Sequence, residues 1–242
     1  HSQGEIAAAH AAAILSLADA AALICTRARL LARLSGGGAM LSVALAADRI
    51  DLPDGVHVAA VNSPSSTILT GSRAALDGLR ETLTTAGVRT REIQATATAG
   101  HSPAVEALRE DLLAATGSLR PEAGHTPFHS TVTGDRIDGA SMTAEYWYVN
   151  MREPVRFAPA LERLLPAHRH IVEVSVHPLL TTAIHEIHEI HDQAGTDGPI
   201  VVTGTLARAH GSAEQLHTAL ARLDVAGRTP LWAPPPAGVR RV

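Results

Sequence analysis

Strand-like and helix-like segments alternate along residues 40–94, and this alternation restricts the possible folds more than any other feature of the sequence. The strand-like segments are short and rich in apolar residues, and the longer helix-like segment is amphipathic and ends at a glycine. In chain order, the expected elements are a strand at 40–45, a short helix at 46–51, strands at 56–64 and 66–71, a helix at 72–87 and a strand at 88–94. This order predicts a small β-α-β-β-α-β subdomain of the ferredoxin-like kind.

Helices and strands on both sides of this unit predict a larger α/β domain around it. Before it, an Ala-rich helix is expected over 3–14, and a second helix from the Ser16 cap to about Leu34. After it, we expect strands at 128–135, 170–178 and 200–205, and helices that start at Ser102 and cover 157–166, 179–190 and 212–227. The aromatic-rich stretch 145–157 is expected to be a loop, and 170–178 a buried strand.

Charge and composition narrow the range of partners. The formal net charge of -4 does not favour nucleic acid as the main partner. All 20 basic residues are arginine, so an anionic substrate must be bound by Arg, His or backbone N–H groups. The single cysteine, Cys25, excludes an internal disulfide, and we expect it to be buried in its helix. No signal peptide or membrane-spanning run is recognisable, so a cytoplasmic location is expected.

The first residues, HSQGE, match the later part of a G-x-S-x-G nucleophile motif. In that motif the serine lies on a sharp turn before a helix, and the N–H of the next residue points at the developing oxyanion. Ser2 is followed at once by an expected helix, so Ser2 is a candidate nucleophile and Gln3 a candidate oxyanion donor. Taken alone, the S-x-G fragment is a weak signal.

Two more residues could take part in chemistry. His101 stands immediately before an expected helix, where a general base could lie on a loop, although a lone histidine is more often structural. Arg27 lies among apolar neighbours in the second helix, and burying a guanidinium is costly unless it is paired. Arg27 therefore either faces solvent or binds a carboxylate, for which a bidentate contact is the strong form.

Eight segments occur in a characteristic order: HSQGEIAAAHAAAILSL, TRARLLARL, MLSVAL, NSPSSTILTG, GHSPAVEALREDLL, FHSTVTG, YWYVNMREPVRF and EVSVHPLL. Together they resemble the acyltransferase domain of a modular type I polyketide synthase over about residues 1–205. The remainder, with LARLDVAGRTPLW, resembles the linker that follows such domains. The resemblance implies an α/β-hydrolase-like main subdomain with an inserted ferredoxin-like subdomain. It divides the chain into the first part of the main subdomain (1–38), the ferredoxin-like subdomain (39–97), the second part of the main subdomain (98–208), and a C-terminal helix with linker (209–242).

The resemblance also implies roles for single residues. Ser2 matches the nucleophile, His101 the general base, and Gln3 the residue whose N–H helps to form the oxyanion hole. Arg27 matches the residue that binds the free carboxylate of a malonyl-type substrate, and a backbone carbonyl near residues 175–178 is implied to orient His101. A preceding strand and a Gly-Gln loop belong to such domains, so residues 1–242 alone are not expected to complete the active site.

The implied partners are an acyl-coenzyme A donor, the phosphopantetheine arm of an acyl carrier protein, and the neighbouring ketosynthase and linker of the same multienzyme. No bound cofactor, metal, nucleic acid or membrane is implied. A charge-assisted contact from Arg27 contributes about 1.5–3 kcal/mol, which corresponds to an approximately tenfold to hundredfold preference for an acyl group with a free carboxylate.

In this family, the choice of extender unit follows the four residues that end at the catalytic histidine. Tyr-Ala-Ser-His accompanies methylmalonyl, and His-Ala-Phe-His accompanies malonyl. This chain has Thr98, Ala99 and Gly100 before His101, and the smaller side chains at 98 and 100 leave more space. Gln3 also goes with the branched-extender group. We therefore predict a tolerant site for an α-substituent larger than methyl, such as ethyl or a longer alkyl or aryl-alkyl group.

Other interpretations stay open. The domain could be methylmalonyl-specific with a drifted motif, or an inactive scaffold segment. It could also be a serine hydrolase of the α/β-hydrolase type, with Asp135 as the acid and His177 or His210 as the base.

The remaining polar residues are expected to be structural. His177 is interpreted as structural in the acyltransferase reading, and so are Asn62, Asn150, Arg152 and Arg156. His185, His188 and His191 of the HEIHEIH segment are expected on a solvated helix face and not at a metal site. The same is expected of His125 and His129.

Overall fold

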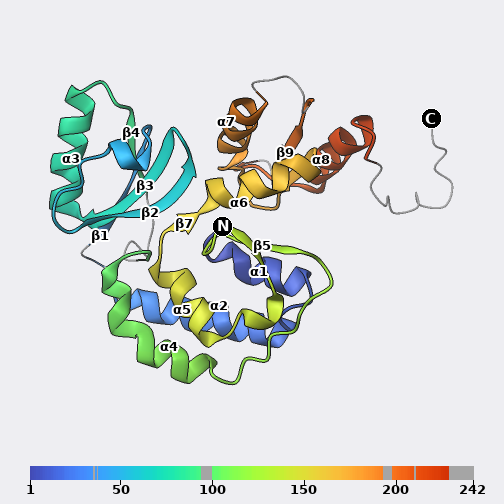
Figure 1. Cartoon of the computed structure of the whole chain (residues 1–242), viewed down its shortest axis with the longest axis horizontal. Helices are drawn as coiled ribbons and strands as arrows, with labels where there is room; N and C mark the ends of the chain where they lie inside the picture. Colours follow the sequence, from blue (N-terminus) through green and yellow to red (C-terminus); the bar gives the residue numbers. More distant parts are fainter. Residues whose placement is uncertain (35, 37, 94–99, 193–197, 210, 229–242) are drawn as a thin grey trace. The chain divides into compact units, whose positions relative to one another are not determined.

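The computed structural model of the chain describes residues 1–34, 36, 38–93, 100–192, 198–209 and 211–228 (Figure 1). The chain divides into two compact units, His1–Pro166 and Ala167–Val242, and each is described by itself. This division follows compactness alone, and the four-part division expected from the sequence stays a prediction. No helix in the described part of the chain is long and apolar enough to cross a membrane.

A five-stranded sheet organises the first unit. Its strands are β1 (Gly38–Val43), β2 (Val56–Ser63), β3 (Ser66–Ser72), β4 (Thr90–Ile93) and β7 (Val155–Arg156), in the order β4-β1-β3-β2-β7. The first four strands pair only in antiparallel fashion, and β7 joins β2 in parallel. The order β4-β1-β3-β2 is consistent with the predicted ferredoxin-like arrangement, with the one-turn helix η1 (Ala47–Arg49) in place of the first helix.

Amphipathic helix α3 (Arg73–Thr85) covers this sheet in Figure 1. The side chains of Leu76, Leu79 and Leu83 recur at helical spacing and are buried in one cluster with Leu41 and Leu69 of the sheet. Ser72 caps the helix, because its side chain accepts a hydrogen bond from the Ala75 N–H. The subdomain therefore has its own apolar core.

Four further helices form the helical part of the first unit: α1 (Gly4–Ala11), α2 (Leu17–Ala32), α4 (Arg109–Thr116) and α5 (Ala144–Arg152). Figure 1 shows α2, α4 and α5 packed side by side. The strands β5 (Phe128–Ser130) and β6 (Asp135–Ile137) form a hairpin. The short 3-10 helices η2 (Pro103–Leu108) and η3 (Gly139–Ser141) lead into α4 and α5, and α6 (Phe157–Leu164) follows β7.

The buried face of α2 includes an arginine and leaves out the cysteine. Ala20, Leu23, Leu30 and Leu31 are buried, and Arg27 lies on the same stripe. Cys25 is exposed, so its predicted burial is wrong. For Arg27 the sequence left two possibilities open, exposure to solvent or a paired buried position, and the structure buries it. The Ser16 cap is confirmed, because the Ser16 side chain accepts from the Asp19 N–H.

The stretch 145–157 is largely helical, so the predicted loop is wrong. Within α5, Trp147, Asn150 and Met151 are buried, and their three- and four-residue spacing is that of one helix face. The aromatic and β-branched residues of this stretch have weaker helix propensity, and Pro154 follows closely, so local signals concealed the helix.

The second unit contains a parallel pair of strands, β8 (His170–Glu173) and β9 (Val201–Gly204), with helices α7 (Thr181–His191) and α8 (Ala213–Val225); the turn η4 (Leu165–Ala167) precedes it. The predicted buried strand over 170–178 ends early, and Val174 and Val176 are 83% and 80% exposed. The Glu173 carboxylate accepts the N–H groups of Leu179 and Leu180, which turns the chain into α7.

Candidate active site

The nucleophile and base predicted from the sequence lie in hydrogen-bond contact. Ser2 precedes α1 and has a φ of 52°, a left-handed backbone conformation that a non-glycine residue adopts only under local constraint. His101 also has a positive φ, 58°, just before η2. These two strained turns place Ser2 Oγ 2.7 Å from His101 Nε2, although the residues are 99 positions apart in the sequence.

The C-terminal end of α5 fixes His101 from the other side. The His101 N–H donates to the Met151 carbonyl, and ring atom Nδ1 lies 2.7 Å from the Glu153 carbonyl oxygen. A carbonyl can only accept, so Nδ1 carries the proton and the free Nε2 faces the serine hydroxyl. The orienting carbonyl that the resemblance placed near 175–178 is therefore wrong, because Glu153 supplies it. No carboxylate contacts His101 among the described residues.

Burial keeps the histidine neutral. His101 is 7% exposed, and removal from water lowers its pKa to about 4. The hydrogen bond to the Glu153 carbonyl opposes this shift, and the nearby charge of Arg27 adds to it. A neutral imidazole can accept the serine proton across the whole physiological pH range.

Arg27 is buried beside the same serine. Its side chain is 5% exposed, Nη2 donates to Ser2 Oγ at 3.4 Å, and Nη1 donates to Asn150 Oδ1 at 3.0 Å. Burial lowers the Arg27 pKa to about 10, and the charge of Glu5 opposes the shift. The Nε–H is buried without an acceptor among the described residues. This cation therefore has spare donor capacity next to the nucleophile.

Sequence reasoning missed two members of this site. Asn150, expected only to brace a loop, contacts Arg27, the Ser2 carbonyl at 3.4 Å and Glu5 at 3.2 Å. Glu5 is 2% exposed in the first turn of α1 and was not considered. One signal could have found Glu5, since it follows the nucleophile motif directly on a helix whose next residues are apolar.

The other predicted site residues are placed as follows. Gln3 lies at the N-cap of α1, and its backbone N–H meets no acceptor in the described part of the chain. Gly100 has open space around it: a Cβ there would meet no described heavy atom within 4 Å. Thr98 and Ala99 lie outside the described residues.

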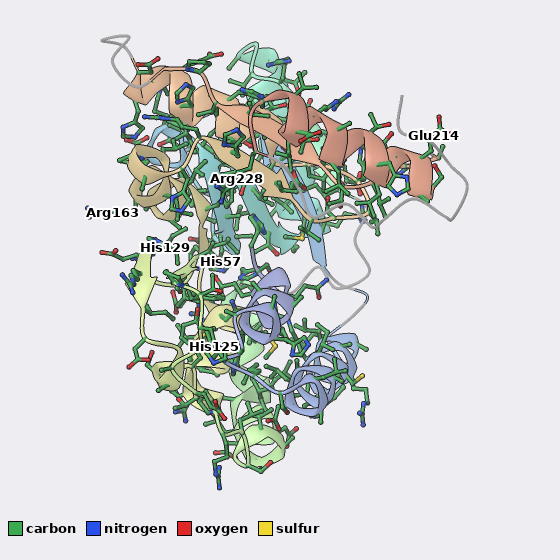
Figure 2. The ribbon with its side chains drawn as sticks, turned by 90° about the vertical axis from the view of Figure 1, so that its right-hand side faces the viewer. His57, His125, His129, Arg163, Glu214 and Arg228 are labelled. Carbon is green, nitrogen blue, oxygen red and sulfur yellow. The ribbon has the colours of Figure 1, made fainter. Side chains whose placement is uncertain are left out.

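The structure also places several residues that the sequence analysis expected to be structural. His125 precedes β5 and His129 lies within it (Figure 2). Asn62 at the end of β2 accepts from His1 Nε2 at 2.8 Å, and His177 Nδ1 accepts from the Arg208 N–H. His188 is buried, which contradicts its predicted place on a solvated face. Within the described ranges, no group of three or more His, Cys, Asp or Glu side chains could hold a metal.

Known proteins are similar to this chain in sequence and in fold. The model of the acyl transferase domain family matches residues 1–230. The chain is 44% identical, over 239 residues, to the spectinabilin polyketide synthase system protein NorA' of Streptomyces orinoci. The match covers 96% of this chain and 6% of that protein. The acyltransferase domain from module 8 of the salinomycin polyketide synthase is 42% identical with a TM-score of 0.88, over 95% of this chain and 54% of the other.

A third comparison involves a bound acyl group. The solved acyltransferase domain of SpnD, in complex with 2-(pent-4-yn-1-yl)malonyl, is 30% identical with a TM-score of 0.82. The match covers 94% of this chain and 55% of that structure. The chain thus spans about half the length of these solved domains.

A serine–histidine pair on an α/β fold, with a buried arginine beside it, defines an acyl-transferring enzyme site. The chain belongs to the acyl transferase domain family. Its solved relatives include acyltransferase domains of modular polyketide synthases, and the chain spans 6% of the length of NorA' and 54% of the salinomycin structure.

Proposed function

We propose that this domain transfers a substituted malonyl group from coenzyme A to the phosphopantetheine thiol of an acyl carrier protein, through an ester on Ser2. The observation that carries the proposal is the 2.7 Å contact between Ser2 Oγ and His101 Nε2, beside the buried Arg27. Coenzyme A and the carrier arm are substrates, and the residues at the site provide the acid–base chemistry without a bound cofactor.

In the first half-reaction, His101 Nε2 takes the proton of the Ser2 hydroxyl as Oγ attacks the thioester carbon. The carbonyl oxygen becomes an oxyanion, which the Gln3 N–H is placed to stabilise at the start of α1. The tetrahedral intermediate then collapses, the carbon–sulfur bond breaks, and protonated His101 returns its proton to the departing coenzyme A thiolate.

The second half-reaction reverses these roles with a different thiol. His101 removes the proton of the carrier phosphopantetheine thiol, whose sulfur attacks the Ser2 ester. The carbon–oxygen bond to Ser2 breaks, and the serine recovers its proton from His101. The hydrogen bond from Nδ1 to the Glu153 carbonyl holds the ring in one tautomer throughout.

Arg27 favours the binding of a substrate that carries a free carboxylate. Its Nε–H has no acceptor among the described residues, and its contact with Ser2 Oγ is long at 3.4 Å. A malonyl-type carboxylate supplies the acceptor and the counter-charge that this buried cation lacks at its free edge. An acetyl-type group supplies neither.

The proposed extender is larger than methylmalonyl. The open space around Gly100 and the small Thr98 side chain in the sequence both support a wide pocket. The SpnD domain, which was solved with a pentynyl-substituted malonyl group, is a relative at 30% identity. A wide pocket admits large groups but excludes small ones weakly, so we expect a tolerant site that favours longer chains by about 1–3 kcal/mol.

The test is a competition between donors, made with the whole gene product. The protein is incubated with equimolar malonyl-, methylmalonyl-, ethylmalonyl- and hexylmalonyl-coenzyme A, and intact-protein mass spectrometry reads the adducts. We expect the larger acyl groups to dominate and Ser2→Ala to carry none. Dominant malonyl or methylmalonyl adducts would refute the extender proposal. The absence of any adduct would refute the acyl-transfer proposal and favour the interpretation of the domain as an inactive scaffold segment.

A matched variant tests the pocket directly. Gly100→Ser adds a small side chain where a Cβ meets no described atom, so the fold should tolerate it. Combined with Thr98→Tyr, it gives the Tyr-Ala-Ser-His pattern of methylmalonyl enzymes. We expect this double variant to shift the adducts towards methylmalonyl. An unchanged adduct distribution would show that these positions do not set the choice.

A further inference from the structure

Glu5 is a buried carboxylate that the acyl-transfer mechanism does not use. It is 2% exposed on α1, and four donors converge on it. Oε1 accepts from the Thr131 N–H and the Thr131 hydroxyl, both at 2.5 Å, and Oε2 accepts from the Tyr146 hydroxyl at 2.5 Å and from Asn150 Nδ2 at 3.2 Å. A buried group with this many donors and no bonded acceptor is suited to negative charge.

Asn150 connects this carboxylate to Arg27. Its Oδ1 accepts from Arg27 Nη1 at 3.0 Å, while Nδ2 donates to Glu5 Oε2 at 3.2 Å. Arginine can only donate and an ionised carboxylate can only accept, so these two neighbours together fix which way the amide points. Without the carboxylate, the 3.4 Å contact of Nδ2 with the Ser2 carbonyl is the one described contact that still opposes a turn of the NH₂ group towards the guanidinium.

Arg27 depends on this bridge for its position. Nη1 is held by Asn150, whereas among the described residues Nη2 makes only the long contact with Ser2 Oγ. Two apolar clusters flank the arginine on α2, one including Leu23 and the other Leu30, and they supply no polar partner. The Glu5 charge also opposes the effect of burial on the Arg27 pKa.

We propose that Glu5, acting through Asn150, is a positioning residue that orients the Arg27 guanidinium for the substrate carboxylate. The inference rests on the proposed function, in which Arg27 binds that carboxylate. Loss of the Glu5 charge removes the shorter of the two contacts that orient the amide, which weakens the anchor of the guanidinium and takes away its nearby counter-charge. Recognition of the carboxylate should weaken, while attack by Ser2 on the thioester is changed equally for every donor.

The test compares two donors that differ only in the carboxylate, methylmalonyl- and propionyl-coenzyme A. The kcat/KM for acylation of Ser2 is measured for each with the whole gene product, and the ratio of the two values is the readout. Glu5→Gln keeps the size of the side chain and removes its charge. Glu106→Gln is the matched control, since Glu106 forms an exposed ion pair with Arg152.

We expect the wild-type ratio to favour methylmalonyl by about tenfold to a hundredfold, and Glu5→Gln to lower it by roughly tenfold. Glu106→Gln should leave it unchanged. A folded Glu5→Gln protein with the wild-type ratio would overturn the inference. A wild-type ratio near one would instead refute the role of Arg27 in the proposed function. Asn150→Ala cuts the same bridge from α5 and decides the question if Glu5→Gln fails to fold.

Discussion

Acidification should destabilise this protein through His101 in particular. Burial lowers the His101 pKa from 6.5 to about 4. Between these two pH values, the unfolded chain binds a proton at this residue and the folded chain does not. The free energy of unfolding therefore falls as the pH drops from 6.5 towards 4, and the loss is complete below 4. At about 1.4 kcal/mol per pH unit, the total is about 3 kcal/mol.

Urea denaturation at about pH 7.5 and at about pH 4 measures this loss. Carboxylates also begin to titrate near the lower value, so the comparison is made with His101→Asn. Asparagine keeps a donor that can reach the Glu153 carbonyl but does not titrate. The wild type should lose about 3 kcal/mol more than the variant between the two conditions. Equal losses would show that burial of His101 does not exclude its proton.

The same shift sets the pH dependence of acylation. His101 must be neutral to accept the Ser2 proton, so the single-turnover rate should stay level from about pH 8 to pH 5 and fall with a midpoint near 4. The high-pH limit comes from Arg27, whose pKa is about 10. A midpoint near pH 6.5 in the wild-type rate would refute the reasoning if the residual rate of His101→Asn lacks that midpoint, because the midpoint then belongs to His101.

Three substitutions test the packing of the first unit, each by urea denaturation. Trp147→Ala should lower the free energy of unfolding by about 3–5 kcal/mol, because Trp147 is 1% exposed in the core; a loss below 1 kcal/mol would contradict this. Gly71→Ala should cost about 1–3 kcal/mol, since its Cβ would lie 2.7 Å from the Gly55 carbonyl oxygen, and a neutral result would mean that the strands separate easily. Arg33→Ala should cost less than about 1 kcal/mol, because its ion pair with Asp111 is exposed, and a larger loss would reveal a role beyond that pair.

Local patterns predicted the ferredoxin-like unit because each of its elements has a clear period. Helix α3 repeats leucines at helical spacing, and β1 alternates buried and half-buried residues. The same approach failed for α5, where the buried face includes Asn150 between Trp147 and Met151. It failed again on α2, where Cys25 was expected to be buried but is exposed. In both helices a polar residue of the site, Asn150 or Arg27, lies on the buried face.

The residues that can carry out the chemistry are recognisable in the sequence. A serine before a helix, a histidine before another and an arginine within an apolar helix were each recognisable by residue type and local context. Their order along the chain, together with the surrounding motifs, was enough to indicate the family.

How those residues act together depends on contacts that form when the chain folds. The Glu153 carbonyl that orients His101 is a backbone atom, and any residue at that position could provide it, so no sequence pattern identifies it. The Glu5–Asn150–Arg27 bridge joins three helices, α1, α5 and α2, across 145 positions. Burial makes these contacts strong and shifts the pKa of His101, and burial is a property of the packed chain and not of any local segment.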